Sequence, residues 1–346
     1  MAKRVDETTV GILIPTYNRR EFLEQALASA LGQSYANLAV IVIDNGSTDG
    51  TTDYMASVID PRVRYVVNDR NLGLIGSINR GIGLMPREVT WCTVLCDDDL
   101  LDREFVRSML ATVTALATRC IVHSHRIFVD EQGRRIGAAS MAPAEETAFD
   151  YLQMRALSKR ETYLTGVLFQ RAAFVEIGSY PAFTTGLLSD DALIFALALR
   201  DRLVFSKDAA SFIRIHSGAE SLTASDAARK LDTIAEFEAY CREKAAGQKA
   251  DSLDGSLRGY VRAMNSFWWL AGVHGFFDSD DTGEKLAPFI ARVVANRDRF
   301  SPRVRLAVAG ARVFGVCPER FAWYRALWAA VKRLVVSLKK QNRRLG

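Results

Sequence analysis

The chain has 346 residues, of which 49% are hydrophobic and 25% charged, and it carries a formal net charge of +5. This composition is typical of an ordered globular protein and excludes a disordered or fibrous chain. The five cysteines include no CxxC pair, so we expect neither a disulfide framework nor a structural zinc site. The N-terminus lacks the apolar run of a signal peptide, and no stretch of 18 or more apolar residues predicts a membrane span. We therefore expect a cytoplasmic protein.

Short apolar runs alternate with helical patterns over the first 130 residues. Strands are predicted at Val10–Pro15, Leu38–Ile43, Val63–Val67, Thr90–Leu95 and Ile121–Val129, and helices at Glu21–Leu31, Gly50–Val58, Leu74–Leu84 and Asp102–Ala117. This alternation predicts an α/β fold in which helices cover both faces of a parallel sheet. In such sheets the ligand crevice lies beyond the carboxyl ends of the strands.

Polar segments follow four of the predicted strands, at residues 16–19, 44–50, 68–71 and 97–99. Each of them taken alone could be a turn or a helix cap, and residues 47–49 are as well explained by a cap as by a binding role. The three adjacent aspartates 97–99 differ, because neighbouring like charges cost stability unless a cation or a proton relieves them. Mg²⁺ and Mn²⁺ bind carboxylate oxygens and often share them with substrate phosphates. A diphosphate–metal clamp is therefore the favoured interpretation, and a solvated acidic turn is the alternative.

Four segments in register resemble the nucleotide-sugar half of the GT-A fold family 2 glycosyltransferases: Val10–Asn18 (VGILIPTYN), Val40–Thr51 (VIVIDNGSTDGT), Asn71–Ile82 (NLGLIGSINRGI) and Cys96–Leu101 (CDDDLL). The likeness covers roughly residues 8–220. It implies an inverting glycosyltransferase that uses Mn²⁺ or Mg²⁺. The implied reaction moves a sugar from a UDP- or dTDP-sugar to a glycan or lipid-linked acceptor, in the synthesis of surface polysaccharide or glycoconjugate.

The resemblance also assigns residues to the donor site. It implies nucleotide-sugar contacts at Pro15, Thr16, Tyr17, Asn18, Asp44, Asn45, Arg70, Asn71, Gly73, Asn79 and Asp97. Metal ligands are implied at Asp98, Asp99 and His216, of which Asp98 is the favoured principal ligand. The chain departs from the family pattern where Cys96 replaces the first Asp of a DxD arrangement, and Asn45 stands where many relatives have Asp.

A second group of segments continues the resemblance, at residues 165–174, 177–180 and 189–193. In relatives, an acidic pair before an apolar helix supplies the catalytic base, which takes the proton of the attacking acceptor hydroxyl. This implies Asp191 as the base, with Asp190 as the alternative because the register is uncertain by one residue. His216 follows a β-branched strand and precedes a Ser-Gly segment, whereas His123, His125 and His274 are expected to be structural.

The C-terminal region is predicted to be helical, which divides the chain into a GT-A domain (1–222, with halves at 8–130 and 131–222) and a helical region (223–346). From residue 303 onward eleven Lys and Arg accompany one acid, so this end carries +10. An apolar helical stripe runs from Trp323 to Leu338 beside these charges. Residues 318–346 could therefore lie on an anionic membrane surface, pack on the body or mediate self-association. No nucleic-acid partner is expected.

Two other enzyme classes are excluded because this chain lacks the glycine-rich loops that they require. A sugar-nucleotide pyrophosphorylase needs one directly after the first strand, and a dehydrogenase needs GxGxxG after an early strand. A non-enzymatic alternative remains, in which the chain is a nucleotide-binding pseudo-enzyme or a membrane-docked adaptor. The presence of Asp98, Asp191 and His216 together argues against it.

Overall fold

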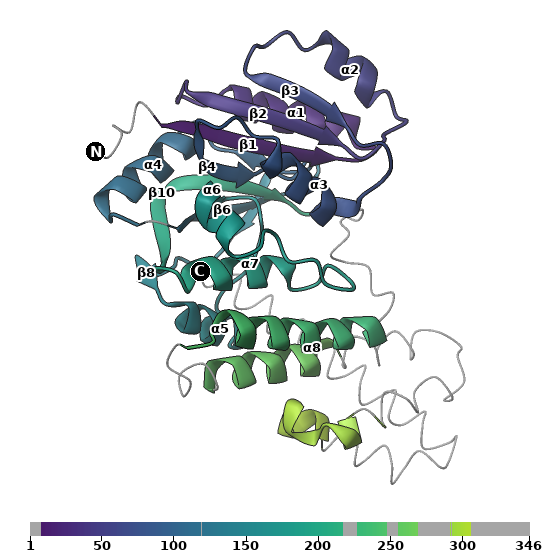
Figure 1. Cartoon of the computed structure of the whole chain (residues 1–346), viewed down its shortest axis with the longest axis vertical. Helices are drawn as coiled ribbons and strands as arrows, with labels where there is room; N and C mark the ends of the chain where they lie inside the picture. Colours follow the sequence, from purple (N-terminus) through teal and green to yellow (C-terminus); the bar gives the residue numbers. More distant parts are fainter. Residues whose placement is uncertain are drawn as a thin grey trace.

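The computed structural model describes residues 8–118, 120–216, 227–247, 255–268, 291 and 293–305 (Figure 1). Its strands are β1 (Thr9–Thr16), β2 (Leu38–Asp44), β3 (Val63–Val67), β4 (Val89–Val94), β5 (Leu100–Leu101), β6 (Ile121–Val129), β7 (Arg135–Ala138), β8 (Glu145–Glu146), β9 (Val167–Gln170) and β10 (Leu203–Arg214). The nine elements predicted for the first 130 residues are all present, with ends shifted by up to three residues.

The helices α1 to α8 accompany these strands in the described part of the chain. They are α1 (Arg20–Leu31), α2 (Thr51–Ser57), α3 (Gly73–Gly83), α4 (Phe105–Ala115), α5 (Ala148–Ala156), α6 (Arg171–Glu176), α7 (Ser189–Ala198) and α8 (Ala227–Lys244). Residues 255–268 are also helical, and a short 3-10 helix spans Arg297–Arg299.

One ten-stranded sheet forms the centre of the molecule, in the order β3-β2-β1-β4-β9-β6-β10-β5, with β7 beside β6 and β8 beside β10. The first four strands in this order are parallel, as predicted. Strand β9 comes from much later in the chain and inserts antiparallel between β4 and β6. The sheet is therefore mixed beyond β4, and its parallel half carries the motifs of the first 100 residues.

Strand residues alternate between two hydrophobic layers, because successive side chains in a strand point to opposite faces. Ile12 and Ile14 pack in a cluster with α1 and α4, whereas Leu13 packs in a second cluster with α3, α6 and α7. The contact between α3 and β1 is close: a Cβ added at Gly81 would lie 2.3 Å from a methyl carbon of Leu13. The prediction of an α/β fold with helices on both faces of the sheet is confirmed.

Three helices form further layers on one side of the sheet. Helix α7 lies between the sheet and a layer made by α5 and α8 (Figure 1). The hydrophobic cluster around α7 includes Phe237 of α8 and Tyr260 of the next helical segment. The described helices beyond residue 222 thus share one core with the preceding domain.

No helix within the described residues is long and apolar enough to cross a membrane. Residues 318–346, His274 and Cys317 lie outside the described residues. The four cysteines that the structure describes are all free thiols: Cys92, Cys96, Cys120 and Cys241.

Candidate active site

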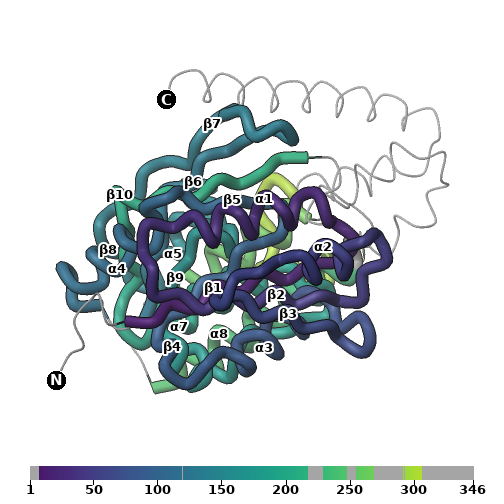
Figure 2. Tube along the Cα trace, turned by 90° about the horizontal axis from the view of Figure 1, so that it is seen from above, coloured from purple at the N-terminus to yellow at the C-terminus, as the bar shows by residue number. Residues whose placement is uncertain are grey.

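Strands β1, β2 and β3 lie side by side (Figure 2), and β4 pairs with β1 on the other side; all four run parallel. Their carboxyl ends, and the polar segments that follow them, therefore lie at one edge of the sheet. Two side chains tie the first two of these segments together. Asn18 accepts a hydrogen bond from the Thr48 backbone at 2.7 Å, and Asp49 accepts one from the Arg20 backbone at 2.8 Å. The loop after β1 is therefore fixed against the loop after β2, and on its other side it contacts the segment that follows β4.

The three aspartates follow β4 and are held by the end of β1. Asp97 is buried and accepts a hydrogen bond from the Thr16 hydroxyl at 2.8 Å. Arg19 places one guanidinium nitrogen 3.2 Å from Asp97 and 2.9 Å from Asp98. This guanidinium supplies the positive charge that the aspartate triplet requires.

Strand β10 brings His216 to the same place. The two-residue strand β5 pairs antiparallel with β10, and this pairing joins the chain after the aspartates to the end of β10. The Nε2 atom of His216 lies 3.0 Å from a carboxylate oxygen of Asp98. Asp99 accepts a hydrogen bond from the backbone of Arg214 at 2.9 Å. Two residues that are 118 positions apart in the sequence, Asp98 and His216, are therefore in contact.

Burial and mutual repulsion raise the pKa values of two of these carboxyl groups. Burial, with a contribution from the charge of Asp98, raises the pKa of Asp97 to about 6 and that of Asp99 to about 7. Such shifts mean that the folded protein resists holding all three negative charges at once. A bound divalent cation would remove this resistance.

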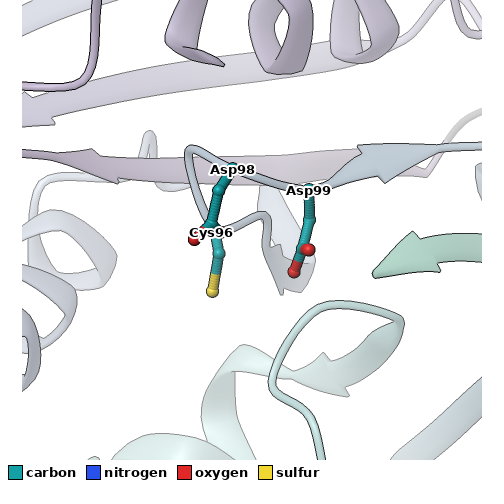
Figure 3. Close-up of side chains that lie close together, drawn as sticks. All are labelled: Cys96, Asp98 and Asp99. Carbon is teal, nitrogen blue, oxygen red and sulfur yellow. The ribbon is translucent and has the colours of Figure 1, made fainter. Parts of the chain in front are cut away.

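The donor set fits a hard divalent cation. Ligand atoms of Cys96, Asp98 and Asp99 all lie within 4.8 Å of one another (Figure 3). Burial raises the pKa of the Cys96 thiol well above its usual value, so the sulfur keeps its proton and is a poor ligand. The carboxylates of Asp98 and Asp99, with the imidazole of His216, are suitable ligands for Mn²⁺ or Mg²⁺.

Two residues assigned to nucleotide binding instead have their acceptor atoms occupied within the fold. Asp44 is fully buried and accepts bonds from the Tyr65 hydroxyl at 2.6 Å and from Ser47. The amide oxygen of Asn45 accepts three hydrogen bonds, from Asn68 at 2.7 Å, Ser77 at 2.8 Å and the Leu72 backbone at 3.1 Å. These contacts shape the loop that the base would enter.

Other assigned residues remain accessible at this edge. Tyr17 is 47% exposed, and Arg70, Asn71 and Gly73 are also exposed. Gly73 begins α3 with a positive φ of 69°, a conformation that favours glycine. Pro15 is buried at the end of β1. These exposed residues are accessible to a nucleotide, although the Asn71 side chain already accepts a hydrogen bond from the backbone of Gly73.

Asn79 connects the donor side of the site to the acidic pair. Its side chain donates to the carbonyl of Tyr180 at 3.0 Å and accepts from the backbone N–H of Tyr180 at 2.9 Å. The Tyr180 hydroxyl in turn donates to the carboxylate of Asp190. These contacts connect α3, through Tyr180, to Asp190 at the start of α7.

The acidic pair lies in the first turn of α7, and neither member caps the helix, since the N-cap residue is Leu188. Asp191 is buried, and Arg155 contacts its two carboxylate oxygens at 2.6 and 3.1 Å. Tyr151 and Thr162 donate further hydrogen bonds to the same carboxylate at 2.8 and 3.0 Å.

Asp190 is less buried than its neighbour and has a different environment. Burial raises the pKa of Asp190 above its usual value, while the bond from Tyr180 and the charges of Arg155 and Arg126 oppose the rise. Its charge also contributes to the raised pKa of the Cys96 thiol beside the aspartate triplet. The two members of the pair therefore have different partners, Tyr180 for Asp190 and Arg155 for Asp191.

Sequence reasoning overlooked three arginines that define the charges of this site: Arg19, Arg126 and Arg155. Arg19 adjoins the segment that ends at Asn18, so its position next to a recognised motif was an available signal. Arg126 and Arg155 lie in a strand and a helix with no local pattern that marks them. Their importance comes from contacts between residues far apart in the sequence.

The mixed α/β sheet, flanked by helices and with a carboxylate cluster beyond its parallel strands, has the architecture of a GT-A type glycosyltransferase. Residues 11–178 match the model of glycosyl transferase family 2, and this part of the chain belongs to that family. The fold is similar to that of S. aureus TarS 1–349 in complex with UDP-GlcNAc, with a TM-score of 0.69 and 16% identity over 94% of this chain and 92% of that one.

Curated relatives are similar over shorter segments. An uncharacterized glycosyltransferase of Haemophilus influenzae is 27% identical over 212 residues, which are 60% of this chain and 79% of that protein. The succinoglycan biosynthesis protein ExoO of Rhizobium meliloti is 34% identical over 113 residues, 33% of this chain and 32% of its own length. The mannosyltransferase PcManGT from Pyrobaculum calidifontis, solved with GDP-Man and Mn²⁺, has a TM-score of 0.50 and 17% identity over 94% of this chain and 86% of its own.

Proposed function

We propose that this glycosyltransferase acts with inversion and needs Mn²⁺ or Mg²⁺. It moves a sugar from a UDP- or dTDP-sugar to a glycan or lipid-linked acceptor in the synthesis of surface polysaccharide. The observation that carries the proposal is the contact between Asp98 and His216, beside the buried carboxylates of Asp97 and Asp99. The similarity to TarS, solved with UDP-GlcNAc, and to ExoO supports the donor and acceptor classes.

The residues divide into two groups with separate tasks. Asp98, Asp99 and His216 would hold the cation, which stabilises the negative charge that develops on the departing nucleoside diphosphate. Arg19, which contacts two of the aspartates, supplies further positive charge at the same place. The exposed residues Tyr17 and Arg70 are suited to contact the nucleoside.

Of the acidic pair, we propose Asp190 as the catalytic base. The acceptor hydroxyl loses its proton to this carboxylate while its oxygen forms the new bond to the anomeric carbon. The bond from that carbon to the diphosphate breaks on the opposite side, and its electron pair leaves with the diphosphate. The raised pKa of Asp190 supports this role, because a stronger base takes the proton more readily. Asp191 has both oxygens occupied by Arg155, which makes it a weaker candidate.

The metal clamp is tested with the substitution Asp98→Asn. Binding of UDP and of dTDP is measured by calorimetry with Mn²⁺ and with EDTA, for the wild type and for this variant. We expect wild-type binding to weaken strongly in EDTA, and the variant to bind weakly in both conditions. Asp208→Asn, an exposed carboxylate on β10, is the control and should behave as the wild type. Equal nucleotide affinity with Mn²⁺ and with EDTA in the wild type would contradict the clamp.

A further inference from the structure

Residues 162–165 connect the acidic pair of α7 to the aspartate triplet. At one end of this segment, the Thr162 hydroxyl donates to the carboxylate of Asp191 at 3.0 Å. At the other end, the fully buried Thr165 accepts the backbone N–H of Cys96, next to the triplet, at 3.0 Å. Even a fully extended chain advances at most about 11 Å over three residues, so the Cα atoms of Thr162 and Thr165 lie no farther apart than that. The segment therefore spans the distance between the two groups of carboxylates.

The ring of Tyr163, between these two ends, contacts a ring at the same edge of the sheet as the triplet. Its neighbour is Phe128, with the two ring centroids 5.8 Å apart. Strand β6 runs parallel to β4, because both pair antiparallel with β9, so Phe128 near its carboxyl end lies at the edge that carries the site. In the adjacent strand β10, Phe128 is in register with Ile213, and the next residue, Arg214, donates its backbone N–H to Asp99. Strand pairing and ring contact therefore place Tyr163 beside the triplet.

The hydroxyl of Tyr163 is not used by the part of the fold that the structure describes. It makes no hydrogen bond to a described residue, and it is not among the buried polar atoms that lack a partner. The hydroxyls of Tyr151 and Tyr180, by contrast, donate to Asp191 and Asp190. Tyr163 is half-buried, and burial raises the pKa of its hydroxyl, which therefore keeps its proton at neutral pH. It offers a ligand both an apolar ring and a hydrogen-bond donor.

We propose that Tyr163 binds the acceptor, and that the acceptor unit which carries the attacking hydroxyl is a pyranose. In the proposed reaction that hydroxyl lies between the catalytic carboxylate and the donor sugar, because the carboxylate takes its proton while its oxygen attacks. Tyr163 directly follows Thr162, at the end of the segment that contacts the acidic pair, where the acceptor hydroxyl must be.

A pyranose matches the two groups that Tyr163 offers. Its C–H groups pack on the electron-rich face of an aromatic ring, and its hydroxyls bond to the phenol. This inference rests on the proposed function and adds to it: a sugar ring, rather than a lipid chain or a bare phosphate, lies at the acceptor position.

The binding test uses the full-length protein with ¹³C-labelled tyrosine rings and follows their signals by NMR. Mn²⁺ is present together with UDP or dTDP, whichever binds more tightly, and the Tyr163 signal is assigned with the substitution Tyr163→Phe. The probes are the methyl pyranosides of glucose, galactose, mannose and N-acetylglucosamine. We expect at least one of them to shift the Tyr163 signal, and glycerol at the same hydroxyl concentration to leave it unchanged. No shift with any pyranoside, or an equal shift with glycerol, overturns the proposal.

Variants separate this role from a purely structural one, with pyranoside binding measured by saturation-transfer NMR. Tyr163→Phe should keep the melting temperature but weaken binding about threefold to tenfold, because one hydrogen bond is lost. Tyr163→Leu should weaken binding further, because the ring is lost as well. Tyr240 is the matched control: its ring lies 5.8 Å from that of Phe183, and its hydroxyl also lacks a partner. Tyr240→Phe should bind as the wild type does. Equal binding by the wild type and Tyr163→Leu would mean that the ring serves only the fold.

A last comparison distinguishes the acceptor from the donor sugar. The same nucleotide is added with Mn²⁺ either alone or as its glucose and N-acetylglucosamine derivatives, without any pyranoside. If a nucleotide sugar shifts the Tyr163 signal relative to the nucleotide, and the pyranosides do not, the ring contacts the donor sugar and the assignment to the acceptor is wrong. Metal-dependent nucleotide binding is measured on the same samples. Its persistence without a pyranoside shift would remove this inference and leave the proposed function in place, whereas its absence would contradict the proposed function itself.

Discussion

The guanidinium of Arg155 contacts both carboxylate oxygens of Asp191, at 2.6 and 3.1 Å, in the buried layer between α5 and α7. Helix α5 is fixed at its start by a capping box between Thr147 and Asp150, and Arg155 lies in its last turn. The ion pair therefore joins two helices, whereas the adjacent Asp190 accepts its hydrogen bond from Tyr180 instead.

This arrangement predicts opposite effects for the two members of the acidic pair. Asp190→Asn should fold normally and bind donor and metal, but transfer sugar about 10²–10⁴-fold more slowly, because general-base help is lost. Asp191→Asn should lower the free energy of unfolding by about 3 kcal/mol, since Arg155 is left buried without its counter-charge. Single-turnover transfer rates and urea unfolding measure the two effects.

The control for this pair is the double variant Arg155→Met/Asp191→Leu, which replaces the ion pair by apolar side chains. It should recover most of the stability that Asp191→Asn loses, because replacing a buried ion pair with apolar groups is often neutral. If Asp191→Asn instead keeps full stability and loses transfer while Asp190→Asn stays active, Asp191 is the base.

Arg19 is predicted to compensate the aspartate triplet when no metal is bound. Arg19→Gln should lower the melting temperature of the metal-free protein, because Asp97 and Asp98 lose their shared positive partner. The same variant should show a larger rise in melting temperature with Mn²⁺ than the wild type, since the cation then relieves more repulsion. Differential scanning fluorimetry with EDTA or Mn²⁺ measures both shifts.

Arg20→Gln is the matched control, because Arg20 pairs with Glu24 on the surface, where an ion pair contributes little. Equal responses of the Arg19 and Arg20 variants to Mn²⁺ would mean that Arg19 does not act on the triplet.

The pH dependence of transfer should reveal the environment of Asp190. A base must be ionised, so kcat should fall as the pH falls through the pKa of Asp190, which lies above the usual range of an aspartate. Tyr180→Phe removes a hydrogen bond that opposes this rise, so the acidic limb of the profile should move to higher pH. Rates at saturating donor and metal over a pH series measure the limb.

Tyr240→Phe is the control for the pH series, because the Tyr240 hydroxyl is buried in α8 and has no hydrogen-bond partner. Its profile should coincide with that of the wild type. An acidic limb that does not move in Tyr180→Phe would show that another group controls it.

The parallel half of the sheet could be predicted because its strands are short, largely apolar runs that alternate with helical patterns. Ile12 and Leu13 pack in hydrophobic layers on opposite faces of the sheet, and apolar side chains at both positions are sufficient for this. The insertion of β9 between β4 and β6 could not be predicted, because a four-residue strand has no periodicity that identifies its neighbours. The location of the site, at the edge formed by the carboxyl ends of the parallel strands, could be predicted from the strand directions alone.

Within the site, the sequence identified the residue types better than their contacts. The position of His216 next to Asp98 depends on the pairing of β5 with β10, and only the family resemblance indicated it. The internal bonds of Asn45 and the ion pair of Asp191 depend on partners such as Ser77 and Arg155. Such partners are set by tertiary packing, which no local pattern records.

Asn79 provides the last test, because the resemblance and the geometry give it different roles. The resemblance implies a contact with the sugar diphosphate, whereas its amide bonds both backbone groups of Tyr180. If the second role is the important one, Asn79→Ala should lower the free energy of unfolding by about 1–3 kcal/mol, because the Tyr180 backbone loses its partners. It should also reduce kcat through the displaced Tyr180 and Asp190, with little change in the Kd for the donor.

Asn71→Ala is the matched variant, because Asn71 is exposed at the donor edge and bonds only the nearby backbone of Gly73. It should weaken donor binding and leave the unfolding free energy almost unchanged. Calorimetric titration of the nucleotide, urea unfolding and kcat, measured on both variants, separate the two roles. If Asn79→Ala has normal stability but binds the donor weakly, Asn79 contacts the sugar diphosphate, as the resemblance implies. Loss of stability with an unchanged donor Kd would assign it to the connection between α3 and the catalytic segment.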